Sequence, residues 1–197
     1  MQLLAVSKTH PAEAVRALAA AGQRAFGENY VQEALQKMQV LADLDLEWHL
    51  IGPLQSNKAK PAAEHFQWVH SLDRPKLVAA LARHRPPGMP PLNVLVQVNI
   101  DGEDTKSGCN PGDVGTLAAA IVAEPTLRLR GLMAIPRPDP AARRRAFAAL
   151  RKLFEGLQRD HPGVDTLSMG MSADFPEAIA EGATLVRIGT ALFGSRA

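Results

Sequence analysis

A lysine ends the first apolar run of the sequence. The stretch LLAVSKTH, residues 3–10, predicts a buried strand that finishes on Lys8. Lysines are seldom buried without a partner or a chemical role. At the rim of an apolar pocket, partial burial favours the neutral, nucleophilic amine. Such an amine forms a Schiff base with a carbonyl compound, so Lys8 is the first candidate for covalent chemistry.

Small polar residues follow the last two apolar runs. The stretches SMGMS and RIGTALFG place Ser172 after one run, and Gly189 and Thr190 after the other. Glycine lets the backbone approach a ligand, the hydroxyls donate hydrogen bonds, and a helix that begins here presents amide groups to an anion. Tight turns alone would also explain the glycines. Two such loops at neighbouring strand ends nevertheless favour a phosphate site.

Arg187 stands between Val186 and Ile188 in the final apolar run, so strand alternation points it away from both. It could form a structural ion pair, or it could place a cation beside a phosphate or an aromatic ring nitrogen. With Lys8 and a phosphate site, it indicates a phosphorylated aldehyde or ketone. Pyridoxal phosphate and a sugar-phosphate substrate of aldolase type both fit. His49, in EWHLIG, could contact a ligand or form a core hydrogen bond, which is the commoner role.

Repeated strand–helix units have to position these residues. Strand-like runs occupy residues 3–7, 23–29, 47–52, 67–72, 93–100, 127–135, 165–171 and 184–189. Helical spacing covers residues 11–21, 31–41, 75–83, 114–123 and 141–159, and the third and seventh helices should be short. Strands separated by helices imply a parallel sheet. Eight units favour a single (β/α)₈ barrel, residues 1–197, whose active groups lie at the carboxyl ends of the strands.

Composition narrows the function classes. Hydrophobic residues make up 46% and charged residues 21% of the chain, and the net charge is only +2. We therefore expect a soluble, cytoplasmic protein with neither a nucleic-acid nor a membrane partner. The basic run at residues 143–145 is predicted to be a solvated helix face. The lone Cys109 excludes an internal disulfide and lies in a turn-like stretch, KSGCNPGD, so it is a poor nucleophile. Histidine and carboxylate spacing predicts no metal site.

Several motifs occur in the order typical of one family. They are LLAVSKTH, FGENYVQE, WHLIGPLQSNK, VHSLDR, QVNIDGEDTKSG, RGLMAIP, LSMGMSADFPEAI and GATLVRIGTALFG. The chain resembles the pyridoxal phosphate homeostasis proteins, which are single-domain relatives of the alanine racemase N-terminal barrel. The match spans nearly the whole sequence.

The resemblance implies that Lys8 carries pyridoxal 5′-phosphate (PLP) as a Schiff base and that Ser172, Gly189 and Thr190 hold its phosphate. It places Arg187 near the pyridine nitrogen. The further residues that it places close to the ring are Asn29, His49 and Met169. Members of this family are thought to bind and buffer the cofactor and to hand it to PLP-dependent enzymes, with no established catalytic turnover. We expect such a carrier, as a monomer, with no catalytic residues.

A PLP-dependent amino-acid racemase is the alternative, and an aldolase or a scaffold protein would be further ones. Racemisation needs an acid–base group on each face of the α-carbon. In alanine racemases, as the resemblance implies, a tyrosine from a second domain serves one face. Here the sequence ends at Ala197, and its sole tyrosine, Tyr30, begins a helix, so we expect no racemisation. Family members also usually carry a helical segment before the first strand, which is missing before Met1. We expect its absence to spare the site and to affect barrel stability.

Overall fold

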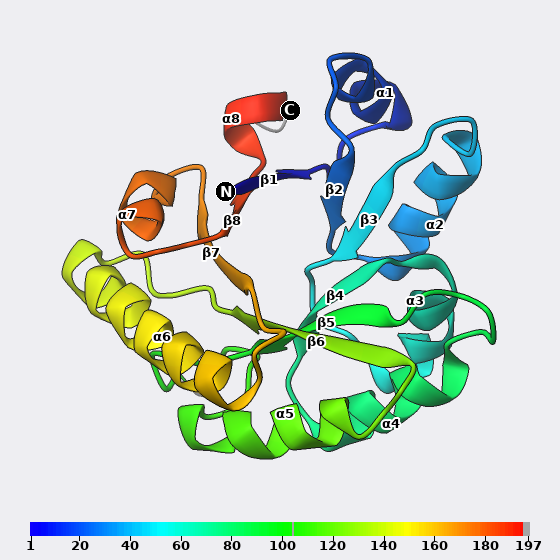
Figure 1. Cartoon of the computed structure of the whole chain (residues 1–197). Coiled ribbons are helices and arrows are strands. Elements are labelled where there is room, and N and C mark those ends of the chain that lie inside the picture. Colours follow the sequence, from blue (N-terminus) through cyan, green and yellow to red (C-terminus); the bar gives the residue numbers. More distant parts are fainter. Residues whose placement is uncertain (104, 195–197) are drawn as a thin grey trace.

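Eight parallel strands close into a barrel in the computed structural model, which describes residues 1–103 and 105–194. The strands are β1 Gln2–Val6, β2 Ala25–Glu28, β3 Glu47–Leu50, β4 Trp68–Leu72, β5 Leu92–Gln97, β6 Leu127–Met133, β7 Thr166–Met171 and β8 Leu185–Ile188. They pair in chain order, and β8 returns to pair with β1. Figure 1 shows this ring with the helices around its outside. The predicted (β/α)₈ barrel is confirmed.

One α-helix follows each strand. The helices are α1 Ala12–Ala20, α2 Val31–Val40, α3 Ala59–His65, α4 Pro75–His84, α5 Val114–Val122, α6 Pro140–Asp160, α7 Phe175–Ala180 and α8 Thr190–Phe193. The brevity expected of the third and seventh helices is confirmed, since α3 has seven residues and α7 has six. Helices α1 to α7 therefore each lead the chain back to start the next strand.

Local signals fix the start of the longest helix. Asp139 is the N-cap of α6, and its Oδ1 accepts a hydrogen bond from the Ala142 amide at 2.8 Å. Pro140 occupies the first turn, where its missing N–H costs no helical hydrogen bond. This helix runs for 21 residues, close to the range that the sequence predicts. Each α-helix in the described part of the chain is too short or too polar to cross a membrane.

Apolar residues fill two separate layers. The larger core lies between the strands and the helices and includes the fully buried Phe26, Leu50, Phe66 and Phe147. Strand residues that alternate with this core face the barrel interior, where two smaller clusters pack. These clusters are Leu4, Ala25 and Leu185 in one, and Trp68, Leu95 and Met133 in the other. The interior is thus packed around its polar groups.

The basic run at residues 143–145 differs from its prediction in one position. Arg144 and Arg145 are exposed, as a solvated face requires. The Arg143 side chain is only 11% exposed and donates to both carboxylate oxygens of Glu177, at 2.7 and 3.1 Å. For Arg143 the prediction is wrong, because α7 packs beside this end of α6 and turns the arginine into an interhelical ion pair.

Candidate binding site at the carboxyl ends of the strands

A cavity of about 460 Å³ opens where the strands end. Its walls include apolar side chains, among them Val6, Ile51, Ile135 and Met171. Six of the predicted site residues also line it: Lys8, Asn29, Ser172, Arg187, Gly189 and Thr190. These six follow or end strands β1, β2, β7 and β8, so the closed barrel brings the two ends of the sequence together at one site.

A buried ionic cluster lies where β1 and β2 end, beside Lys8 in the sequence. Lys37 Nζ donates to Glu28 Oε1, Glu33 Oε1 and the Ser7 carbonyl, each at 2.7 Å. Ser7 Oγ also donates to Glu28 Oε1, at 2.6 Å. The Glu28 side chain is fully buried, and burial raises its pKa above the ordinary value, although the contacts with Lys37 and Ser7 act in the opposite direction. These four residues are called the ionic cluster below.

The ionic cluster holds the backbone on both sides of Lys8. Ser7 belongs to the cluster, and the Thr9 amide donates to Glu33 Oε1 at 2.5 Å. Thr9 has a φ of 65°, a left-handed conformation that is costly for a β-branched residue and needs such support. Ser7 and Lys8 follow β1 directly; Glu28 and Lys37 hold Ser7, and the neighbouring Lys8 lines the cavity.

Arg187, on β8, lines the cavity. Its guanidinium Nη1 donates to the Ser168 carbonyl at 2.9 Å and to Ser168 Oγ at 2.7 Å, and Nη2 donates to the Ala134 carbonyl at 2.9 Å. The residue is 3% exposed, and burial lowers the pKa of Arg187 to about 10. It therefore stays a cation at neutral pH, fixed in place by neutral acceptors.

Hydroxyls and loop amides gather at the ends of β7 and β8. Ser172 Oγ accepts long hydrogen bonds from the Gly189 amide at 3.3 Å and the Ala191 amide at 3.4 Å. Thr190 begins α8, and the His10 ring stacks on Phe193 of that helix with ring centroids 4.7 Å apart. This stacking holds α8 against the loop that carries Lys8. The arrangement offers hydrogen-bond donors to an anionic group.

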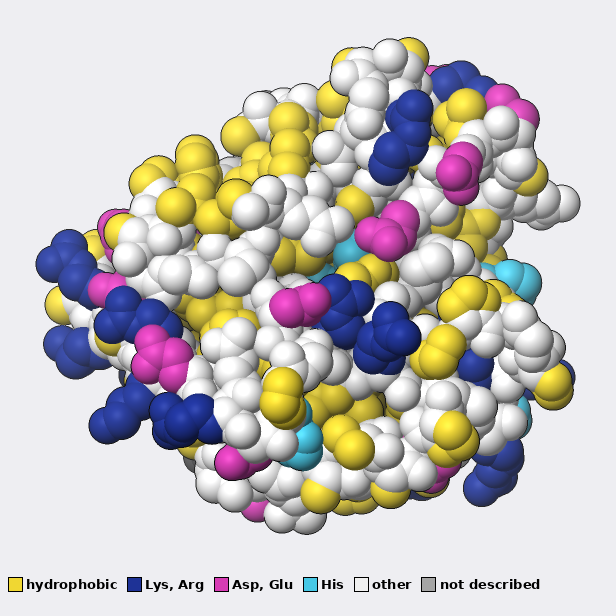
Figure 2. All heavy atoms as spheres, in the orientation of Figure 1, with side chains coloured by type: hydrophobic (Ala, Val, Ile, Leu, Met, Phe, Trp, Pro, Cys, Tyr) yellow, Lys and Arg dark blue, Asp and Glu magenta, His cyan; other side chains and the backbone are white. Residues whose placement is uncertain are grey.

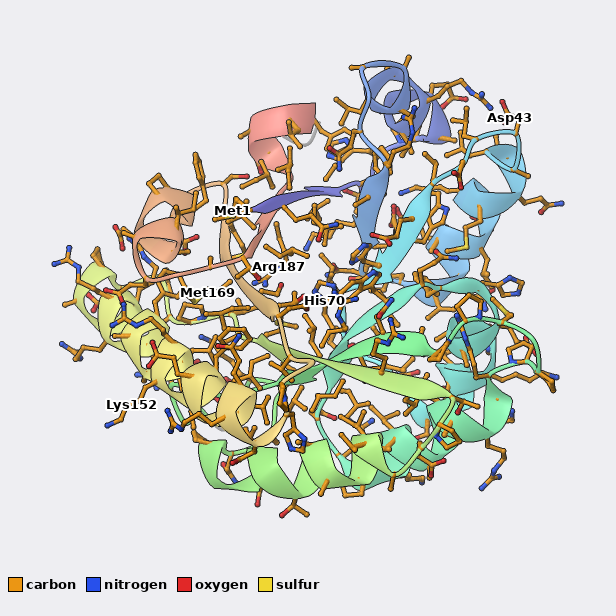
Figure 3. All side chains as sticks on the ribbon, viewed as in Figure 1. Met1, Asp43, His70, Lys152, Met169 and Arg187 are labelled. Atoms are coloured by element: carbon orange, nitrogen blue, oxygen red, sulfur yellow. The ribbon has the colours of Figure 1, made fainter. Side chains whose placement is uncertain are left out.

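His49 and Met169 do not line the cavity. His49 is fully buried on β3, where its two ring nitrogens contact His70 and Glu47. Met169 is buried in the core between strands and helices. Figure 3 shows Arg187 and His70 within the ring of strands and Met169 towards α6 and α7. Ile51, directly after β3, and Met171, at the end of β7, each two residues further along the chain, reach the cavity instead.

Two glycines allow loops to approach the cavity closely. A Cβ at Gly52 would lie 2.2 Å from the Asn29 carbonyl oxygen, and both residues line the cavity. Gly108 has a φ of 122°, and a Cβ there would lie 2.5 Å from the Asn99 amide nitrogen. Gly108 thereby lets the loop after β5 fold back over the strand end. Larger residues at either position would push the loop backbone away.

Sequence reasoning missed several cavity residues. They are His10, Gln97, Lys106 and Ser107. His10 is two residues beyond Lys8, and the others end or follow β5, so their position after strands was the available signal. Lys106 Nζ lies 3.1 Å from Glu103 and 3.4 Å from Asp101, so carboxylates hold it at the rim.

Neither thiol nor metal chemistry has a visible basis in the described residues. Burial raises the pKa of Cys109 to about 11, so this buried thiol is protonated at neutral pH. Within residues 1–103 and 105–194, no group of three histidine, cysteine or carboxylate side chains could hold a metal ion. Figure 2 shows the opposite face, at the amino ends of the strands, where charged and histidine side chains lie close together near the middle. Chemistry in the cavity therefore centres on amine, guanidinium and hydroxyl groups.

The fold and the cavity define a (β/α)₈ barrel with a lysine-lined cavity at the carboxyl ends of its strands. The family model of the alanine racemase N-terminal domain matches residues 1–197. A pyridoxal phosphate homeostasis protein from Pseudomonas aeruginosa is 63% identical over 196 residues, which cover 98% of this chain and 84% of that protein.

Two solved structures of PipY from Synechococcus elongatus are also similar. The structure without PLP has a TM-score of 0.93 at 45% identity and covers 98% of this chain and 93% of its own. The structure with PLP bound has a TM-score of 0.89 at 44% identity, with coverages of 98% and 92%. This chain belongs to the pyridoxal phosphate homeostasis protein family, which has the alanine racemase N-terminal barrel.

Proposed function

We propose that this protein binds PLP through a Schiff base on Lys8 and holds it as an intracellular carrier without catalytic turnover. The proposal rests on one observation: Lys8 and Arg187 line the same cavity as Ser172, Gly189 and Thr190. PLP has an aldehyde, a ring nitrogen and a phosphate, and these residues offer a chemically suitable partner to each. The cavity volume lies within the roughly 300–1,000 Å³ of small-molecule sites. Residues 1–197 then act as one cofactor-binding domain.

Each residue has a defined role in this proposal. Ser172, Gly189 and Thr190 hold the phosphate, and Asn29 flanks the ring. Arg187 faces the ring nitrogen. When bound, PLP supplies an aldehyde and a ring that can draw electrons. A permanent cation beside the ring nitrogen disfavours its protonation and weakens that electron withdrawal, which suits a carrier. The proposed recipients are PLP-dependent enzymes, and the carrier acts as a cytoplasmic monomer.

Titration of the purified protein with PLP tests the binding proposal. We expect saturable Schiff-base absorbance with one PLP per chain, and loss of that absorbance in Lys8→Ala. Lys152→Ala, an exposed lysine change on α6, is the matched control and should bind like the wild type. Full absorbance in Lys8→Ala, or no PLP binding by the wild-type protein, would overturn the proposal.

Incubating the PLP-loaded protein with single amino-acid enantiomers tests the absence of turnover. A group positioned on the second face would contribute about 10²–10⁴-fold to the rate. Tyr30 is 61% exposed and is not among the cavity residues, while carboxylates engage Lys106. We therefore expect no appearance of the opposite enantiomer. Racemisation that disappears in Lys8→Ala would refute the carrier assignment. Loss in His10→Phe or Tyr30→Phe would then identify the second base.

A further inference from the structure

A line of hydrogen bonds crosses the barrel interior below the cavity. Arg187 Nη1 lies 2.7 Å from Ser168 Oγ, which lies 3.2 Å from His70 Nδ1. His70 Nε2 lies 2.9 Å from His49 Nδ1, and His49 Nε2 lies 2.8 Å from Glu47 Oε1. These five residues, from β8, β7, β4 and β3, are called the interior network. It begins on a cation that lines the cavity and ends on a carboxylate.

The two ends of the interior network fix the position of each proton. A guanidinium only donates, so Ser168 Oγ accepts from Arg187. The contact with His49 lowers the pKa of Glu47, so its carboxylate is ionised and accepts from His49 Nε2–H. Burial lowers the pKa of His49 and lowers that of His70 further, so both rings are neutral and carry one N–H each.

The middle of the interior network follows from these ends. His49 carries its hydrogen on Nε2, so its Nδ1 accepts from His70 Nε2–H. His70 Nδ1 then accepts the Ser168 hydroxyl hydrogen. In the opposite tautomers, two N–H groups would point at Ser168 Oγ and a nitrogen lone pair would face the Glu47 carboxylate. Only one arrangement therefore satisfies every member, with all donors directed from Arg187 towards Glu47.

Ring packing holds the interior network rigid. His49 stacks on Trp68 with ring centroids 5.2 Å apart and planes 7° from parallel. The Arg130 guanidinium carbon lies 4.6 Å from the Trp68 ring centroid, which adds a cation–π contact. His70 meets the His49 ring at an edge, with centroids 5.1 Å apart. The imidazoles therefore cannot rotate freely to exchange their donors and acceptors.

We propose that Ser168, His70 and His49 are positioning residues that tie the Arg187 guanidinium to Glu47 and hold it in one orientation towards the ring nitrogen of PLP. The part that concerns PLP rests on the proposed function, whereas the proton arrangement rests on the hydrogen bonds and on the burial of the two rings. An arginine side chain is flexible. Among the described residues, the three hydrogen bonds of Arg187 engage three of its five N–H donors. The remaining donors are thereby set in direction.

Nitrogen NMR of the ligand-free protein, labelled at its histidine rings, tests the proton arrangement. We expect His49 and His70 each to be neutral, with the hydrogen on Nε2. The set of signals lost in His70→Gln identifies His70. His65→Gln, a change at an exposed histidine on α3, should leave both sets unchanged. An Nδ1–H tautomer or a charged ring at either position at neutral pH would overturn the interior network, whether or not PLP binds.

A second experiment compares PLP with 1-deazapyridoxal 5′-phosphate, which lacks the ring nitrogen. Ser168→Ala removes the hydroxyl that links Arg187 to His70, and we expect it to weaken PLP binding roughly tenfold. Binding of the deaza compound should change little. Ser71→Ala, an equally buried serine outside the interior network, is the matched control, and Ser168→Thr should restore affinity. Unfolding curves confirm that each variant is folded.

The outcomes separate this inference from the proposed function. An equal loss of affinity for both compounds in Ser168→Ala would show general damage to the cavity and overturn the positioning role. An unchanged affinity for PLP would overturn it as well. Failure of the wild-type protein to bind PLP would refute the proposed function and the part concerning PLP, while the NMR result would still decide the proton arrangement.

Discussion

The ionic cluster and the interior network both support residues of one cavity, but they do so by different means. The ionic cluster is compact, and a single ammonium satisfies three acceptors at 2.7 Å. It fixes the backbone that flanks Lys8. The interior network spreads five groups across the barrel, with charges only at its ends and neutral rings between them. It fixes the direction of one side chain. The ionic cluster depends on charge pairing, and the interior network depends on which ring nitrogen carries each proton.

Removing the central charge of the ionic cluster should have the largest effect. Lys37→Met leaves the buried Glu28 carboxylate without its cation, so we expect a loss of about 3–5 kcal/mol in the free energy of unfolding. Urea denaturation measures this. Lys60→Met removes a lysine that pairs with Glu64 while its side chain is 63% exposed, so this change should cost less than about 1 kcal/mol.

A double variant sharpens that prediction. Glu28→Leu combined with Lys37→Met removes both buried charges, and it should recover part of the stability that the single change loses. Equal stability losses in Lys37→Met and Lys60→Met would show that charge pairing in the ionic cluster contributes little. The contrast with the interior network would then fail.

The interior network should make stability sensitive to acid. His49 and His70 have pKa values below the ordinary 6.5 because of burial. The unfolded chain therefore binds more protons, so stability is fully present above pH 6.5 and is lost as pH falls towards the folded pKa values. Each histidine contributes up to about 1.4 kcal/mol per pH unit in that window.

Unfolding free energies measured at several pH values check this prediction. His70→Gln should flatten the slope below pH 6.5, because it removes the group whose pKa is lowered further. The charged groups that face the network are Glu47, Arg187 and Arg130. Glu47, whose pKa is lowered by its contact with His49, and Arg187, whose pKa is about 10, keep their charge as pH falls from 7 to 5. Identical slopes for the wild type and His70→Gln would mean that burial does not lower the pKa of His70.

A change at the residues that we assign to the phosphate should have the smallest effect. Thr190→Ala removes one hydroxyl that we assign to the phosphate, and a hydrogen bond to a charged group contributes about 1.5–3 kcal/mol. We expect PLP affinity to fall about tenfold or somewhat more. Pyridoxal, which lacks the phosphate, should bind far more weakly than PLP and should be insensitive to Thr190→Ala. Equal wild-type affinity for pyridoxal and PLP would contradict this assignment.

The sequence predicted the barrel and six of the residues that line its cavity because both depend on local patterns. Apolar runs and helical spacing located the strands and helices. Lys8 and Thr190 were found because a strand end is readable from a few neighbouring residues. Position relative to a strand end was thus enough to bring residues from both ends of the chain to one site.

The two buried assemblies could not be predicted because their contacts are remote or ambiguous. His70 and Ser168 are 98 residues apart, and neither sequence neighbourhood indicates the other. Glu33 and Lys37 have the spacing of an ordinary surface pair, yet the Lys37 side chain is only 7% exposed. The register irregularity between β7 and β8 brings Met171 rather than Met169 to the cavity. A pattern that repeats every two residues does not specify that shift.

Borohydride reduction of the PLP-loaded protein, followed by mass mapping of its peptides, tests the central claim most directly. Reduction converts a Schiff base into a stable bond and so records which lysine carried the cofactor. We predict one pyridoxyl group per chain, on Lys8. A principal adduct on Lys106, which also lines the cavity, or on Lys58 would contradict the account.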